Sequence, residues 1–270
     1  MFRAEMLKLS TVYSTRIAII AGLAGLAFTQ IIMFWVLPVA AVSADVPDNI
    51  PLPNVDTGSF DFQYAALNLV SGGAGSGSVA IALIAILAIG ILSATTDYRS
   101  GGMTAAALAQ PSRGRILVGK AAATSVVIAA TAVAYAIVCV AVLLASTASS
   151  SAEVVVPFAD ILSTVLRGVL ALVLLGLCAL AIGILARSQL AAFLIVIGIV
   201  TVEPIIQGVL ALTGGVPAWS QMLPLALAQT AVGDLTAPTV VNPVAAMCIL
   251  AAITVVIMGT AAVSLKRRDL

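Results

Sequence analysis

The sequence contains no histidine and few charged residues, and both shortages limit what the protein can do. Histidine is the commonest general base and metal ligand, so its absence removes the most frequent route to acid–base catalysis and to a metal centre. Charged residues make up 9% of the 270 residues and apolar residues make up 62%. A soluble domain is about a quarter charged. The composition therefore excludes a soluble enzyme or a nucleic-acid binder and indicates an integral membrane protein, with no nucleic acid among its partners.

Cysteine is also scarce, and its placement argues against a disulfide scaffold. The three cysteines, Cys139, Cys178 and Cys248, all fall inside apolar runs. Disulfide frameworks belong to small secreted domains with many cysteines. We therefore expect three free, buried thiols.

Long apolar runs predict the architecture. A bilayer core about 30 Å thick is crossed by roughly 20 apolar helical residues. Six runs have that length, at residues 17–41, 79–95, 121–146, 161–186, 190–212 and 243–265. They are continuous rather than alternating, which excludes a strand barrel. The sequence thus predicts an all-α integral membrane protein, a single transmembrane domain over residues 1–270 with six transmembrane helices.

Basic residues fall almost entirely on one side of these spans. Lys and Arg in short loops stay in the cytoplasm. Eleven of the twelve basic residues lie on the side that also holds both ends of the chain: Arg3, Lys8, Arg16, Arg99, Arg113, Arg115, Lys120, Arg187, Lys266, Arg267 and Arg268. The opposite loops carry acids and neither Lys nor Arg: Asp45, Asp48, Asp56, Asp61, Glu153, Asp160 and Asp234. We therefore predict that both termini are cytoplasmic.

Three segments outside the spans have a pattern of their own. Residues 1–16 place Phe2, Met6, Leu9 and Tyr13 on one helical face, which predicts an interfacial helix that turns at Thr15 and Arg16 into the first span. The external loop 43–78 is rich in proline and glycine, which favours irregular structure. The external segment 213–242 is apolar but broken by prolines, which predicts short re-entrant helices, dipping into the outer leaflet or packing on the bundle.

The cytoplasmic segment 96–120, between the second and third spans, is the most informative part of the chain. Gly101 and Gly102 permit a sharp turn, residues 103–110 form about two helical turns, and Pro111 stops them. Such an element suits docking of a cytosolic partner, with arginines ready to meet acidic groups. The alternative is a basic loop that only follows the positive-inside rule.

The same segment contains a false nucleotide motif. GRILVGKA matches G-x-x-x-x-G-K, but Ala121 stands where Ser or Thr is needed to hold Mg²⁺. A membrane span follows directly after this motif. The sequence also contains no hydrophobic run that ends in the aspartate of a Walker B motif. We therefore expect no ATPase activity in this chain, and we interpret Lys120 as a snorkelling residue at the start of the third span.

The chain resembles the permease subunits of type 2 ABC transporters over nearly its whole length. The resemblance rests on EMLKLSTVYSTR, on DYRSGGMTAAALAQPSRGRILVGK after the second span, on six spans with both ends inside, and on the terminal KRRDL. Family members carry a comparable series in the middle phrase, although Gly102 stands where many have Thr. The residues that occupy the series here are Asp97, Tyr98, Arg99, Gly101, Pro111, Arg113 and Lys120.

The resemblance implies a function and partners. It implies that segment 96–120 is a coupling helix seated in a groove of a separate cytosolic ATPase subunit, present in two copies and binding ATP and Mg²⁺. It also implies a second permease copy, expected as a homodimer, in the cytoplasmic (inner) membrane of a bacterium, and export as the direction of transport. The predicted spans hold few polar groups, which favours an amphipathic or lipophilic substrate.

Two charges remain inside the membrane. Helical rise puts Arg167 roughly 10 Å and Glu203 roughly 13 Å from the external ends of the fourth and fifth spans. Each is expensive there, about 3 kcal/mol, so we predict that they form a polar pair, within or between protomers. The alternative is that Arg167 reaches Asp160 while Glu203 is protonated or faces a wet pathway.

Rival functions depend on the same acid. A gradient-driven secondary transporter or channel would use Glu203, the one clear intramembrane acid. An intramembrane enzyme is disfavoured by the absence of histidine and of a second mid-span carboxylate. Small residues in the fourth span, Gly168, Ala171, Gly176, Ala179 and Gly183, predict close helix packing without identifying a dimer interface.

Overall fold

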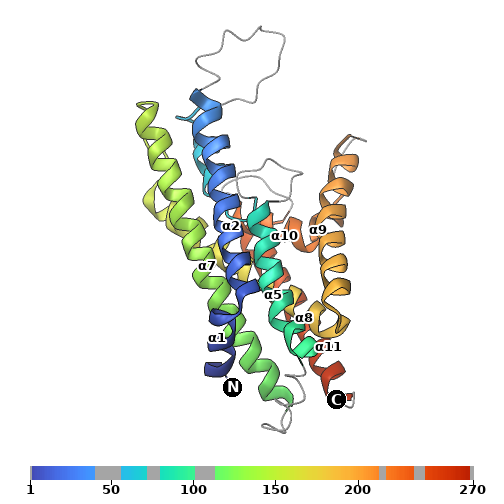
Figure 1. Ribbon diagram of the computed structural model, residues 1–270. Coiled ribbons are helices and arrows are strands. Elements are labelled where there is room, and N and C mark those ends of the chain that lie inside the picture. The colour runs from blue at the N-terminus through green and yellow to red at the C-terminus, as the bar shows by residue number, and fades with distance from the viewer. Residues whose placement is uncertain are drawn as a thin grey trace.

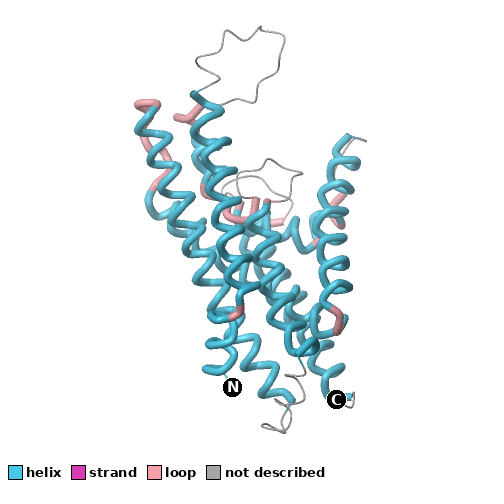
Figure 2. Tube along the Cα trace, in the orientation of Figure 1, coloured by secondary structure: helices cyan, strands magenta, loops and turns pink. Residues whose placement is uncertain are grey.

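The computed structural model describes residues 2–39, 56–71, 80–100, 113–212, 217–233 and 241–267, and in these ranges every regular element is a helix (Figures 1 and 2). The short elements are α1 (Phe2–Thr11), the π-helical turn η1 (Ile32–Val36), α4 (Phe60–Ala66), η2 (Ser220–Met222) and α10 (Pro224–Val232). The long helices are α2 (Tyr13–Ile31), α5 (Ile81–Ser100), α7 (Arg113–Ser149), α8 (Phe158–Ala186), α9 (Gln189–Leu212) and α11 (Pro243–Arg267). The six long helices, α2 with its continuation to Val39, are apolar and long enough to cross a membrane, as predicted.

Helix α8 is the central helix of the bundle. It packs against α5, α7, α9, α10 and α11. Its small residues allow these contacts, since all five that the sequence singled out are buried. Helix α5 approaches the backbone of α8 closely, since a Cβ added to Gly90 would lie 2.3 Å from the carbonyl oxygen of Gly176. The predicted close packing of the fourth span is therefore confirmed, and it acts within one chain.

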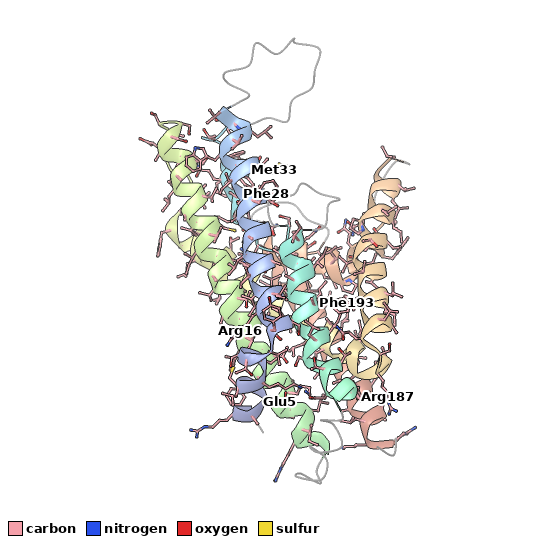
Figure 3. All side chains as sticks on the ribbon, viewed as in Figure 1. Glu5, Arg16, Phe28, Met33, Arg187 and Phe193 are labelled. Atoms are coloured by element: carbon pink, nitrogen blue, oxygen red, sulfur yellow. The ribbon has the colours of Figure 1, made fainter. Side chains whose placement is uncertain are left out.

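The two ends of the chain lie at the same end of the bundle, which holds helix α1 and the C-terminal end of α11 (Figure 1). Glu5 and Arg187 lie toward that end, whereas Phe28 and Met33 lie in the opposite half (Figure 3). This arrangement agrees with an even number of crossings.

The N-terminal helix differs in detail from the prediction. It ends at Thr11, and the extended Val12 (φ −67°, ψ 124°) separates it from α2, so the turn comes before Thr15. Its buried residues are Glu5 and Leu9, while Phe2 and Tyr13 are exposed. The reason is tertiary, because α1 packs on α7 and turns a charged side chain toward the bundle.

Two segments that the sequence predicts to lie outside the membrane are more helical than expected. Helix α7 has 37 residues, which at 1.5 Å per residue is about 55 Å and exceeds the bilayer core. Residues 96–100 continue α5 and residues 113–120 begin α7, whereas the predicted coupling helix at 103–110 lies outside the described residues. Within the segment 43–78, predicted to be irregular, α4 is a helix, because Ser59 caps it and Ala66 and Leu67 pack in a cluster with Phe34.

Candidate functional site

Four charged side chains from three helices meet near the end that holds the termini. Lys120 of α7 pairs with Glu5 of α1 (Nζ to Oε2 3.1 Å) and with Asp97 of α5, which also pairs with Lys8 of α1. Lys120 donates further to the carbonyl oxygen of Ser93 at 2.9 Å. We call Glu5, Lys8, Asp97 and Lys120 the basal ion cluster. It joins α1, α5 and α7 by side-chain contacts at both flanks of residues 101–112.

Burial makes the basal ion cluster sensitive to the loss of any member. The Lys120 side chain is 1% exposed, that of Asp97 10% and that of Glu5 11%. A charge removed from water needs a partner and satisfied hydrogen bonds, and here two cations balance two anions. The prediction that Lys120 snorkels is therefore wrong, because α1 covers its ammonium group and supplies a carboxylate.

The structure places some members of the predicted coupling series and leaves others undescribed. Asp97 and Lys120 are brought together, and the half-buried Tyr98 packs beside Ile116 and Leu265 in the adjoining apolar cluster. Arg113 begins α7, but its side chain and that of Arg99 lie outside the described residues, as do Gly101 and Pro111.

Sequence reasoning missed Glu5 and Lys8 as members of this site. The available signal was the distribution of acids, since Glu5 and Asp97 are two of only three acidic residues on the predicted cytoplasmic side, the third being Asp269. An acid next to a membrane span on that side calls for a basic partner.

A second polar site surrounds Arg167 on the half of the bundle away from the termini. Its guanidinium donates from Nη1 to the carbonyl oxygens of Ala231 (3.0 Å) and Gly233 (2.8 Å) at the C-terminal end of α10. From Nη2 it donates to the Tyr64 hydroxyl at 3.0 Å and to Thr164 Oγ1 at 3.3 Å. The positive charge therefore lies where the dipole of α10 is negative.

Glu203 contacts the other end of the same helix. Its Oε2 accepts from the backbone N–H of Leu225 at 3.2 Å and its Oε1 from that of Ala226 at 2.6 Å, and the residue is 3% exposed. These N–H groups belong to the first turn of α10, which leaves them without intrahelical partners. Pro224 at the first position suits a helix start, because it has no N–H to satisfy.

The direct pairing of Arg167 with Glu203 within one chain is not what the structure shows. The described residues contain three ion pairs, and none of them joins these two side chains. Helix α10 satisfies both charges instead, one at each end. The alternative contact of Arg167 with Asp160 is not among these ion pairs either.

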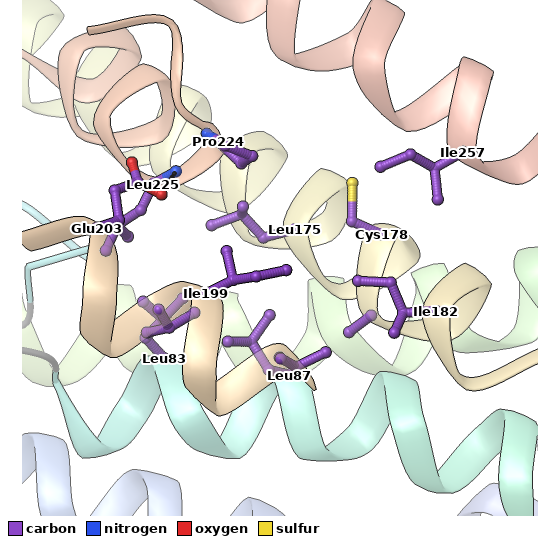
Figure 4. Close-up of a pocket in the computed structure, with 13 residues that line it drawn as sticks. Leu83, Leu87, Leu175, Cys178, Ile182, Ile199, Glu203, Pro224, Leu225 and Ile257 are labelled. Atoms are coloured by element: carbon purple, nitrogen blue, oxygen red, sulfur yellow. Dashed lines mark hydrogen bonds between the residues drawn. The ribbon is translucent and has the colours of Figure 1, made fainter. Parts of the chain in front are cut away.

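An apolar cavity of about 80 Å³ adjoins Glu203 (Figure 4). Its walls come from α5, α8, α9, α10 and α11, and they include Leu83, Leu175, Cys178, Ile199, Pro224 and Leu225. Figure 4 shows the Glu203 oxygens beside Leu225 rather than at the centre of the cavity. The cavity therefore offers an apolar surface, because its acidic side chain is already bonded to α10.

Comparison with protein families and with curated proteins finds no match to this chain.

Proposed function

We propose that the chain is the permease subunit of an ATP-driven ABC transporter, an exporter of an amphipathic or lipophilic substrate powered by a separate ATPase subunit. Six helices long enough to span a membrane and the common end of the two termini support this proposal. The chain acts as a homodimer in the cytoplasmic membrane of a bacterium, with both termini in the cytoplasm. ATP and Mg²⁺ bind to the two ATPase subunits.

The basal ion cluster is the observation that carries the proposal. It fixes the end of α5 and the start of α7 against α1, so the two helices that flank residues 101–112 are tied together. A segment that transmits movement from a cytosolic ATPase must be rigidly attached to the membrane-spanning helices, since a loosely attached loop would move without moving them. Closure of the ATPase dimer then tilts the paired bundles between inward and outward openings.

The gradient-driven alternative is less favoured by the structure. It assigns Glu203 to ion coupling, which needs a carboxylate free to bind and release an ion. Both oxygens of Glu203 accept backbone N–H groups of α10. Glu203 therefore has a structural partner already.

Copurification tests the proposal. The tagged chain is expressed with the ATPase subunit encoded beside it, and we expect an ATPase in stoichiometric amount in the purified complex. Recovery of the chain alone, together with gradient-driven uptake in liposomes, would contradict the proposal.

A charge reversal at Arg113 tests the coupling segment. Arg113→Glu is expected to weaken recovery of the ATPase or to uncouple ATP hydrolysis from transport, since reversal in a desolvated contact costs about 2–5 kcal/mol. Arg267→Glu, at the same end of the bundle on α11, is the matched control and is expected to assemble normally. Unchanged assembly and coupling in Arg113→Glu would make segment 96–120 an ordinary basic loop.

A further inference from the structure

Helix α10 is held at both ends by opposite charges from neighbouring spans. Glu203 of α9 binds its first N–H groups, and Arg167 of α8 binds its last carbonyl groups. Hydrogen bonds with one charged partner are roughly twice as strong as neutral ones. Both charges also have the sign that the helix dipole favours at that end.

These contacts matter because α10 is short. A nine-residue helix is marginal in isolation, so its position depends on tertiary contacts. Apart from Glu203 and Arg167, α10 is held by the Tyr64 hydroxyl, which donates to the carbonyl oxygens of Val232 (3.4 Å) and Gly233 (3.1 Å), and by the packing of apolar side chains such as Leu227 against the bundle. The two charges are thus its directional attachments to α8 and α9.

The first turn of α10 also forms one end of the apolar cavity. Pro224 and Leu225 line the cavity beside Glu203, at the opposite end from Ile182 (Figure 4). On the assigned topology that end faces the outside. Displacement of α10 would therefore remove this part of the wall and open the cavity further toward the outside.

The lining decides which chemical group the cavity accepts. It consists of leucine, isoleucine, valine, alanine, cysteine and proline side chains apart from Glu203, whose oxygens are bonded to α10. A charged or strongly polar group would lose its hydration there without gaining a partner. A hydrocarbon group meets no such penalty.

We propose that α10 is the outward gate of this cavity, that Glu203 and Arg167 are positioning residues that latch it, and that the cavity takes a hydrocarbon group of the transported molecule. The transport part of this statement rests on the proposed function. The latch itself is a property of the chain alone.

Cys178 provides the reporter, because it lines the cavity and is buried. In a chain that keeps Cys178 and carries Cys139→Ala and Cys248→Ala, the rate of alkylation by N-ethylmaleimide is measured in lipid nanodiscs. We expect slow alkylation in this parent and an increase of about tenfold or more in Glu203→Gln and in Arg167→Ala, a factor that corresponds to about 1.4 kcal/mol. Arg167→Lys keeps the positive charge and is expected to react at nearly the parent rate.

Two controls separate gate opening from general unfolding. Thr201→Val alters a hydroxyl of α9 that bonds only to carbonyl groups of its own helix and should leave the rate unchanged. A second series keeps Cys139 instead, which is buried beside Gln30 away from the cavity lining. Alkylation of Cys139 should stay slow in Glu203→Gln and in Arg167→Ala. If the alkylation rate of Cys178 is unchanged in these variants, or if alkylation of Cys139 accelerates equally, α10 is not a gate of the cavity.

Toluene tests the ligand class in the same assay. We expect toluene to slow alkylation of Cys178 and not of Cys139. The same protection of Cys178 is expected in Glu203→Gln and in Arg167→Ala. Protection of neither cysteine, or equal protection of both, would overturn the assignment of a hydrocarbon site. None of these measurements uses the ATPase, so a failure to copurify it would contradict the proposed function and leave the latch standing.

Discussion

Replacing Lys120 by methionine removes one charge from the basal ion cluster while nearly keeping the side-chain volume. In the native chain its ammonium group contacts two carboxylates and the Ser93 carbonyl oxygen. After the change Glu5 and Asp97 share a single cation, Lys8, whose side chain is 26% exposed. The cluster then carries an uncompensated negative charge.

Breaking a buried ion pair by removing one partner costs about 3–5 kcal/mol, because the remaining charge stays desolvated. For a chain of this size that corresponds to a fall in melting temperature of roughly 10 °C. Adding Asp97→Asn to Lys120→Met removes one charge of each sign. The double variant should therefore lose less stability than the sum of the two single variants.

Thermal unfolding of the purified chain in a neutral detergent, followed by size-exclusion chromatography of the remaining monodisperse protein, measures these shifts. Arg115→Met is the matched control, since Arg115 lies on the same helix and is exposed. Surface changes of that kind stay within about 0.5 kcal/mol. If Lys120→Met unfolds at the same temperature as Arg115→Met, or if the single losses add strictly, the cluster does not hold α1 to α5 and α7.

Three further predictions follow from other parts of the bundle. A single cysteine at Asp56 should react with an impermeant maleimide in intact cells, and labelling only after permeabilisation would reverse the assigned topology. Gly90→Ala should destabilise the chain by about 1–3 kcal/mol, because its Cβ meets a backbone oxygen of α8, whereas Gly198→Ala, with nothing within 4 Å, should be tolerated in the same unfolding assay. Ile199→Trp should fill the cavity and reduce transport in proteoliposomes. Ile195→Trp, one turn away and outside the cavity lining, should leave transport unchanged. Equal transport activity of the two variants would show that the cavity has no part in transport.

The apolar runs determined the six long helices because the bilayer imposes the same requirement on every span. Backbone polar groups in hydrocarbon must be bonded within the segment, so a continuous apolar run of sufficient length has one outcome whatever its neighbours are. The small residues of the fourth span likewise predicted close packing, since glycine and alanine permit it against any partner helix. The ends of the helices were less certain: α7 begins eight residues earlier than the apolar run, because polar residues continue a helix outside the membrane.

The partners of the buried charges were decided by the tertiary structure. The sequence shows that Lys120, Arg167 and Glu203 each need a partner, because an isolated charge in a membrane bundle is costly. It does not show which helices pack together, and Lys120 meets Glu5 across 115 positions of the chain. Glu203 and Arg167 find backbone groups at the two ends of α10, and free N–H and carbonyl groups at helix ends have no signature in side-chain composition. Only the packing of α10 between these spans brings them within reach.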